Sequence, residues 1–299
     1  MPTVEVSHIA KSFGDTQAVA DVSFTVERGE IFGLLGPNGA GKTTTIRMIL
    51  DIFRPDRGTV TVLGGPIDEA KKDRIGYLPE ERGLYQDVSL ERCLLYLATL
   101  KGLPEREAQK RLDDYLERFD LAAHRKKKVK ELSKGMQQKA QVINTFLHEP
   151  ELVIIDEPFA ALDPVNVQLV KDLLRRVRTQ GTAIVMSTHQ MHQVEELCDR
   201  IVLIDDGKDV LYGALDEIRR RFSGHAVIVR AQGELPTLAG VKETSPHDGA
   251  FKLALTDDTT PQDVLVALTT RGVILEKFEI ATPSLDEIFI RVVEGGNVR

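Results

Sequence analysis

Short apolar runs alternate along the chain with segments whose apolar residues recur at helical spacing. The runs typical of buried strands lie at 4–9, 19–26, 30–35, 58–64, 74–79, 151–155, 182–187 and 200–205. Helical spacing fills 89–148 and returns near 164–180 and 190–198. Because strands and helices alternate in this order, the pattern predicts an α/β fold with a parallel, doubly wound sheet. The segment 89–148 is expected to be a mostly helical insert.

The pattern changes after a helical segment at 215–222. Strand-like runs then occur in HAVIVRA, FKLALT and VILEKFEI, and helical stretches occur in PQDVLVALTTRG and SLDEIFIRVV. Because domains commonly have ~100–200 residues, a chain of 299 residues has room for two of them. We expect residues 1–222 to form the larger domain and residues 223–299 to form a small α+β domain.

Composition is that of an ordinary globular protein, with 42% hydrophobic and 28% charged residues. The net charge of −7 argues against a general nucleic-acid binder, so no nucleic-acid partner is expected. Cys93 and Cys198 lack metal-type spacing and are expected to be reduced, buried thiols of a cytoplasmic protein. No apolar run approaches the ~18–20 residues that cross a bilayer. Any membrane role would therefore need a separate membrane subunit.

A glycine-rich segment between an apolar strand and a helix is the strongest chemical signal in the chain. The segment GPNGAGKTT consists of Gly36, Pro37, Asn38, Gly39, Ala40, Gly41, Lys42, Thr43 and Thr44, and it fits G-x-x-x-x-G-K-[ST]. Backbone N–H groups of such a loop converge on phosphate oxygens at the positive end of the helix. Lys42 is expected to balance phosphate charge, and Thr43 is expected to hold Mg²⁺.

A pair of carboxylates follows a second apolar strand in ELVIIDEP. Asp156 stands at the end of this strand, where we expect it to hold the Mg²⁺ shell. Glu157 comes one residue later and is expected to act as the general base that takes a proton from the attacking water. An isolated Asp-Glu pair at a strand end is usually a solvated turn, so this interpretation depends on the phosphate-binding loop.

Together with LSKGMQQ at 132–138, ALD at 161–163, STH at 187–189 and KSFGD at 11–15, these motifs resemble those of the ATP-binding cassette (ABC) ATPases. Their order and spacing match across about 220 residues. The resemblance implies a P-loop NTPase fold with an antiparallel β subdomain and a helical subdomain. It also implies that the chain binds ATP and Mg²⁺ and hydrolyses ATP.

The segment LSKGMQQ corresponds to the family's signature sequence, usually LSGGQ, which covers the nucleotide bound by a second copy of the domain. The residues that would bind this nucleotide are Ser133, Lys134, Gly135 and Met136. Ser133 also fits the N-cap of a helix, where a hydroxyl and free N–H groups stabilise an anion. Lys134 and Met136 depart from the family pattern, and Lys134 is either attracted to phosphate or simply solvated.

Four further residues gain a role from the resemblance. His189 corresponds to the residue that orients the water and senses the γ-phosphate. Asp163 corresponds to one that crosses the dimer interface. Phe13 corresponds to the aromatic that stacks on adenine, with a core phenylalanine as the alternative. Glu80 aligns better than Glu81 with the family's glutamine ligand of Mg²⁺, and a carboxylate there keeps an oxygen ligand but adds negative charge.

The segments GYLPEERGLY and PSLDEIFI are similar to those in ATPase subunits of sodium, antibiotic and ABC-2 exporters. This resemblance implies a homodimer of ATPase chains, peripheral on the cytoplasmic face of the cell membrane and bound to a separately encoded permease. Two alternatives stay open. One is an ABC ATPase that acts on nucleic acid or ribosomes, and the other is an ATP-binding switch that does not hydrolyse.

Overall fold

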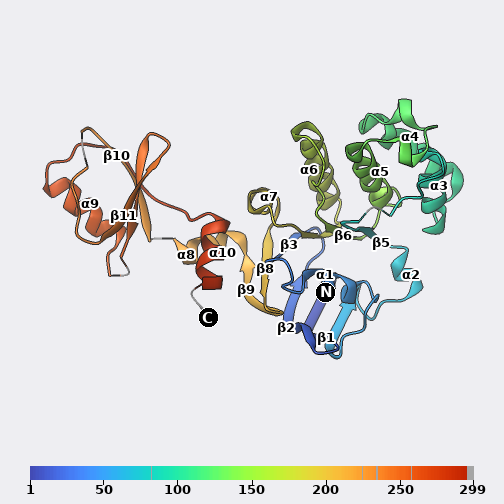
Figure 1. Ribbon diagram of the computed structural model, residues 1–299, viewed down its shortest axis with the longest axis horizontal. Coiled ribbons are helices and arrows are strands. Elements are labelled where there is room, and N and C mark those ends of the chain that lie inside the picture. Colours follow the sequence, from blue (N-terminus) through green and yellow to red (C-terminus); the bar gives the residue numbers. More distant parts are fainter. Residues whose placement is uncertain (82, 224, 234, 257, 295–299) are drawn as a thin grey trace. The chain divides into compact units, whose positions relative to one another are not determined.

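The fold is described from a computed structural model, which covers residues 1–81, 83–223, 225–233, 235–256 and 258–294 (Figure 1). Within this part of the chain, two compact units are present, Met1–Gly213 and Ala214–Arg299. The sequence placed the change of domain at residue 222, whereas the helix α8 (Leu215–Phe222) belongs to the second unit. Each unit is described by itself.

The first unit is built on a large sheet with an antiparallel and a parallel section. In the described residues its strand order is β4-β1-β2-β9-β8-β3-β7-β6-β5. Its strands are β1 (Val4–Phe13), β2 (Thr16–Val26), β3 (Ile31–Leu35), β4 (Arg57–Val62), β5 (Ile75–Leu78), β6 (Leu152–Asp156), β7 (Ala183–Ser187), β8 (Arg200–Asp205) and β9 (Lys208–Ala214). β1 pairs antiparallel with β2 and β4, while β3 pairs parallel with β7 and β8. The expected parallel core and antiparallel β subdomain are confirmed.

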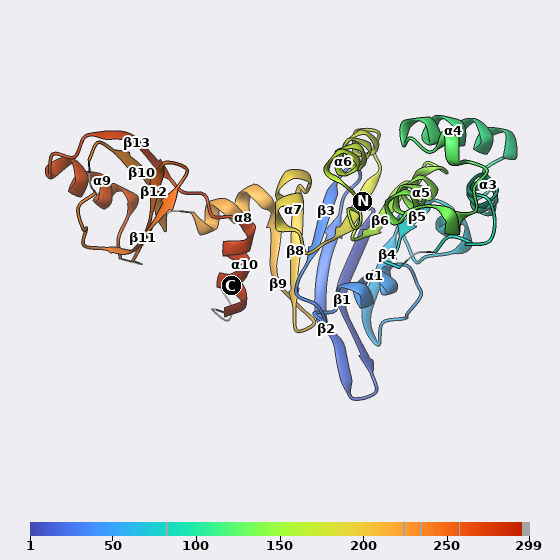
Figure 2. The ribbon, with the colours of Figure 1, turned by 45° about the horizontal axis from the view of Figure 1, so that its top comes forward.

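Helices of the first unit follow the predicted order. They are α1 (Lys42–Ile49), α2 (Glu69–Lys72), α3 (Leu90–Leu100), α4 (Glu105–Arg118), α5 (Lys134–Phe146), α6 (Pro164–Thr179) and α7 (Met191–Leu197), with the 3-10 turns η1 (Ala122–His124) and η2 (Val129–Glu131). Figure 2 shows α3, α4 and α5 grouped beyond the edge of the sheet that β5 forms. The predicted helical insert is therefore confirmed. None of the helices described is long and apolar enough to cross a membrane.

The core of the first unit explains why its central strands are continuous apolar runs. Every residue of β3, β6 and β7 is buried, as expected for parallel strands that are covered on both faces. Phe32, Ile154 and Val185 belong to one buried cluster with Ile46 and Ile49 of α1. This packing holds α1 against the central strands of the sheet.

The second unit is a small α+β domain, as predicted. Among its described residues, the sheet has the order β11-β12-β10-β13 and is antiparallel. Its remaining elements are β10 (Ala226–Ala231), β11 (Val241–His247), β12 (Ala250–Leu255), α9 (Pro261–Thr270), β13 (Leu275–Ile280) and α10 (Leu285–Glu294). Val264 and Leu268 of α9 pack against Val227 and Leu253 on one face of the sheet.

Candidate active site

The ends of parallel strands surround a cavity of about 280 Å³ in the first unit. Asp156 at the end of β6 pairs with Ser187 at the end of β7, and β7 also pairs with β3. Carboxyl ends of parallel strands meet at one edge of a sheet, which is where α/β proteins bind ligands. The described residues that line the cavity are Ala18, Asn38, Gly39, Gly41, Lys42, Thr43, Thr44, Glu80, Asp156, Glu157, Ser187 and His189.

The glycine-rich loop between β3 and α1 has a backbone that only glycine accepts at two positions. Gly36 has φ 146°, and a Cβ there would lie 2.1 Å from the Ile204 carbonyl oxygen. Gly41 has φ 108°, and its Cβ would lie 2.5 Å from the Ala18 carbonyl oxygen. The glycines therefore let the loop lie close to neighbouring backbone and leave room for a phosphate.

Lys42, the first residue of α1, places its ammonium group inside this loop. Its Nζ donates to the carbonyl oxygens of Gly36 at 2.8 Å and of Pro37 at 2.9 Å. Burial lowers the pKa of Lys42, and the nearby charges of Asp156 and Glu157 oppose that shift. A half-buried ammonium group beside carboxylates suits the binding of an anion of high charge.

Asp156 is only 5% exposed, although it carries a carboxylate. Burial raises its pKa and the charges of Glu80 and Glu157 act in the same direction, while Ser187 and Lys42 act against them. A cation in the cavity would relieve this cost of burying negative charge.

Thr43, Glu80 and Asp156 all line the cavity, and their side chains carry oxygen atoms, the kind of ligand that Mg²⁺ prefers. Among the described residues, no group of three His, Cys, Asp or Glu side chains could hold a metal by itself. That is the usual situation for Mg²⁺ in nucleotide sites, where phosphate oxygens and water complete the shell. The residues therefore fit Mg²⁺ bound together with a nucleotide.

Glu157 follows β6 with φ 51°, an unusual left-handed conformation for a glutamate. Its Oε1 lies 2.7 Å from His189 Nδ1 and accepts from the His189 backbone N–H at 3.0 Å. Its Oε2 accepts from the Thr188 hydroxyl at 3.1 Å. These donors, just beyond the end of β7, fix the orientation of the carboxylate.

Other predicted binding residues lie outside the described lining of this cavity. Ser133 is the N-cap of α5 and accepts from the Met136 backbone N–H at 3.2 Å, so the predicted cap is confirmed. A Cβ on Gly135 would lie 3.1 Å from the Ala161 carbonyl oxygen, which places the start of α5 beside the loop that follows β6. Ser133 and Lys134 are exposed.

Asp163 and Phe13 have contacts that the motifs did not indicate. Asp163 is the N-cap of α6, and its side chain accepts from the Asn166 backbone N–H at 3.0 Å. That bond lowers the pKa of Asp163. Phe13 is 44% exposed and packs edge-on against Phe53, with 5.2 Å between ring centroids. Its ring retains an open surface, and the roles expected of both residues stay predictions.

Ala18, Ser187 and Thr188 were not among the predicted site residues. Ala18 lies in β2, far from the phosphate-binding loop in the sequence, and no local pattern marks it. Ser187 and Thr188 directly precede His189 at the end of a predicted strand. Their position in STH was the available signal, because residues at the carboxyl end of a central strand face the site.

Comparisons with known proteins agree with this geometry. Residues 19–160 match the ABC transporter family, and residues 213–293 match the C-terminal domain of DrrA1-3-like ATP-binding proteins. The uncharacterized ABC transporter ATP-binding protein YhaQ of Bacillus subtilis (strain 168) is 43% identical over 96% of this chain and 97% of its own. The linearmycin resistance ATP-binding protein LnrL of the same organism is 31% identical over 97% of both chains.

Similarity extends to solved structures. The structure of an ATP-binding subunit of an ABC transporter has a TM-score of 0.70 and 36% identity, over 74% of this chain and 93% of that one. The sequence leads to one family assignment. The arrangement of the phosphate-binding loop and of the carboxylates at the strand ends agrees with it. The chain belongs to the ATP-binding proteins of ABC transporters and is an ABC-type ATPase.

Proposed function

We propose that this ATPase powers a separately encoded membrane exporter and that its ATP sites form between two copies of the chain. The cavity that gathers Lys42, Asp156, Glu157 and His189 is the observation that carries the catalytic part. The exposed cap at Ser133 supports the shared site, because it lies outside the described lining of its own chain's cavity. A second copy would bring that helix start to the open side of the nucleotide.

Hydrolysis would use these side chains in distinct roles. The loop N–H groups and Lys42 bind the phosphates. Thr43, Asp156 and Glu80 would hold Mg²⁺, which would supply positive charge opposite the phosphate oxygens. Water attacks the γ-phosphorus, its proton passes to a Glu157 oxygen, and the bond to the β–γ bridging oxygen breaks to leave ADP and phosphate. His189 contacts Glu157 and lines the same cavity, and we propose that it orients the water.

An exposed aromatic surface, formed by α3 and by Tyr85 in the segment before it, supports docking to a permease. Tyr85, Tyr96 and Leu100 are 53%, 50% and 57% exposed, and the two tyrosine rings contact each other. Tyr96 lines a hollow of about 450 Å³ together with Arg92 and Leu95. Large apolar side chains that gather on a surface commonly mark a protein interface. Such a partner would hold the chain on the cytoplasmic face of the membrane.

Export is the direction that the relatives favour. LnrL, which aligns with both units of this chain, is named for linearmycin resistance. The match of residues 213–293 to a DrrA-like C-terminal domain adds to this support, since the small domain is shared with that group. We infer no particular cargo, because cargo contacts would lie in the permease.

Purification of the tagged chain from its native membranes tests this proposal. We expect a polytopic membrane protein to co-purify with the wild type and to be lost from Tyr85→Asp, while the ATPase activity of the isolated variant is retained. Val266→Asp, which changes a residue 52% exposed in α9, is the matched control and should keep the membrane protein. Recovery of both variants with ribosomes or DNA instead would contradict the exporter proposal and support the nucleic-acid alternative.

A further inference from the structure

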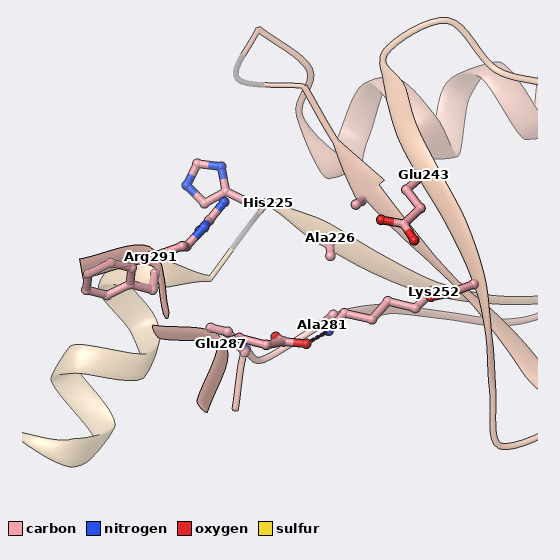
Figure 3. Close-up of a pocket in the computed structure, with 11 residues that line it drawn as sticks. His225, Ala226, Glu243, Lys252, Ala281, Glu287 and Arg291 are labelled. Atoms are coloured by element: carbon pink, nitrogen blue, oxygen red, sulfur yellow. Dashed lines mark hydrogen bonds and ion pairs between the residues drawn. The ribbon is translucent and has the colours of Figure 1, made fainter. Parts of the chain in front are cut away.

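A separate cavity of about 240 Å³ lies wholly within the second unit (Figure 3). Its described lining is Phe222, His225, Ala226, Glu243, Ser245, Lys252, Ala254, Ala281, Pro283, Glu287 and Arg291. These residues come from α8, α10, the face of the sheet opposite α9, and the segments that join the helices to the sheet. None of them takes part in the ATPase chemistry described above.

Small side chains create the hollow. Ala226 on β10 and Ala254 on β12 are directly paired across the strands, and both line the cavity together with Ala281. Because side chains alternate along a strand, their neighbours Val227 and Leu253 point to the opposite face and form the core under α9. Phe222 adds a buried aromatic wall. The middle of the cavity is therefore apolar and open.

Charged groups of opposite sign lie at different ends of the apolar surface that Ala226, Ala254 and Ala281 form, called the alanine floor below. Figure 3 shows Arg291 beside His225 at one end, whereas Glu243 reaches toward the cavity from another strand. Lys252 and Glu287 form an ion pair with each other along one side. Among the described residues, no hydrogen bond or ion pair engages the side chains of Arg291 or Glu243. These two charges are available to a ligand.

The sheet register sets the separation of the two ends. Glu243 is paired with Ala254, which is paired with Ala226, the residue that follows His225. Two steps between neighbouring strands span about 10 Å. The volume lies below the ~300–1,000 Å³ of drug-sized sites, so the ligand is compact.

We propose that this cavity binds a compact zwitterion whose acidic group and amino group are separated by a short apolar chain. Arg291 and His225 bind the acidic group, because a guanidinium and an imidazole N–H both donate to a carboxylate. Glu243 binds the ammonium group at the other end. The alanine floor and Phe222 cover the chain between them. An α-amino acid alone does not span the two ends, since its charged groups are adjacent.

Titration of the full-length protein with 6-aminohexanoate tests the proposal, with hexanoate and hexylammonium as probes that each lack one charge. Binding is followed by NMR of alanine methyl groups, because Ala226, Ala254 and Ala281 line the site. We expect 6-aminohexanoate to shift these methyl signals and to bind roughly tenfold or more tightly than either singly charged probe, as loss of one charged hydrogen bond predicts.

Arg291→Gln and Glu243→Gln should each weaken binding of 6-aminohexanoate about tenfold or more. Arg291→Gln should leave hexylammonium unaffected, and Glu243→Gln should leave hexanoate unaffected, which separates the two ends. Glu279→Gln, on β13 of the same sheet and outside the described lining, is the matched control and should bind as the wild type does. The proposal is overturned if 6-aminohexanoate shifts none of the three methyl signals, or if it binds no better than both single-charge probes.

Discussion

Replacing Glu157 by glutamine should abolish most hydrolysis while leaving the fold and ATP binding intact. Glutamine has nearly the shape of glutamate but cannot take a proton at neutral pH. Its amide oxygen can still accept from the His189 N–H groups that now bind Glu157 Oε1. Its amide nitrogen can donate to the Thr188 hydroxyl, which now donates to Oε2. The local hydrogen bonds therefore survive with one reversed.

The expected sizes of the two effects differ clearly. Reversing the Thr188 hydrogen bond and replacing its charged acceptor by a neutral amide changes the free energy of unfolding by roughly 1–2 kcal/mol. Loss of a general base lowers the rate by ~10²–10⁴-fold, which corresponds to about 3–5 kcal/mol in the activation free energy. The variant should therefore remain folded and bind ATP but release phosphate very slowly.

Steady-state phosphate release and equilibrium ATP binding, measured on the same samples, check this prediction. Glu151→Gln is the matched control, because Glu151 directly precedes β6 and Glu157 follows it. Glu151 is half-exposed and pairs with Arg74 at the surface, so its loss should leave hydrolysis unchanged. Phosphate release by Glu157→Gln at a rate within about threefold of the wild type would refute the general-base role.

Three further changes test the phosphate-binding loop, the role of Glu80 and the burial of His148. Gly36→Ala should lower the free energy of unfolding by about 2–5 kcal/mol and Gly39→Ala by about 1–2 kcal/mol. Both glycines have positive φ, but only at Gly36 would the added Cβ clash with neighbouring backbone. Equal losses of stability in urea titrations would contradict this. At limiting Mg²⁺, Glu80→Gln should keep ATPase activity and Glu80→Ala should lose it, and equal rates would remove Glu80 from the site. Burial lowers the pKa of His148 to about 4. As the pH falls, the unfolded chain therefore takes up this proton before the folded chain does, and stability falls between pH ~6.5 and 4. His148→Gln should show a smaller fall in denaturation midpoint over this pH range, and an unchanged pH dependence would exclude His148 as the cause.

Burial explains which strands the sequence predicted. The strands β3, β6 and β7 lie in continuous apolar runs because both of their faces are covered. By contrast, β11 (Val241–His247) is an edge strand with mostly exposed, polar residues, and β9 (Lys208–Ala214) has only one fully buried residue among those described. Backbone pairing does not require apolar side chains, so the hydrophobic pattern predicted neither β9 nor β11.

The extended ends of the first hairpin show the same limitation. Strands were expected at 4–9 and 19–26, but β1 continues to Phe13 and β2 begins at Thr16. Gly14 makes the turn between them with φ 58°. The added residues are largely exposed and are held by cross-strand backbone bonds, which apolar periodicity does not report.

In the candidate active site, the sequence predicted those side chains that closely follow an apolar strand in the chain. Lys42, Asp156 and His189 all line the cavity as expected from their order in the chain. The hydrogen bonds from Thr188 and His189 to Glu157 could not be predicted, because they join residues 31 and 32 positions apart that follow the ends of neighbouring strands. Such contacts depend on the pairing of β6 with β7 and on the left-handed backbone at Glu157.

If the helix start at Ser133 completes the ATP site of another copy, two copies should associate only when ATP is bound. In the Glu157→Gln background, size-exclusion chromatography with light scattering should show a dimer with MgATP and a monomer without nucleotide. Adding Ser133→Arg should abolish the dimer, because a long side chain at the exposed start of α5 blocks the approach of an opposing phosphate. Loss of the cap itself costs only about 1 kcal/mol, and ATP binding by the monomer should persist.

Thr270→Arg, at an exposed position of α9, is the control that should leave the ATP-dependent dimer intact. A shared ATP site requires an ATP-dependent dimer in the control and a monomer that still binds ATP in the Ser133→Arg protein. A Ser133→Arg protein that dimerises with ATP as readily as the control, or that no longer binds ATP as a folded monomer, would contradict the shared site.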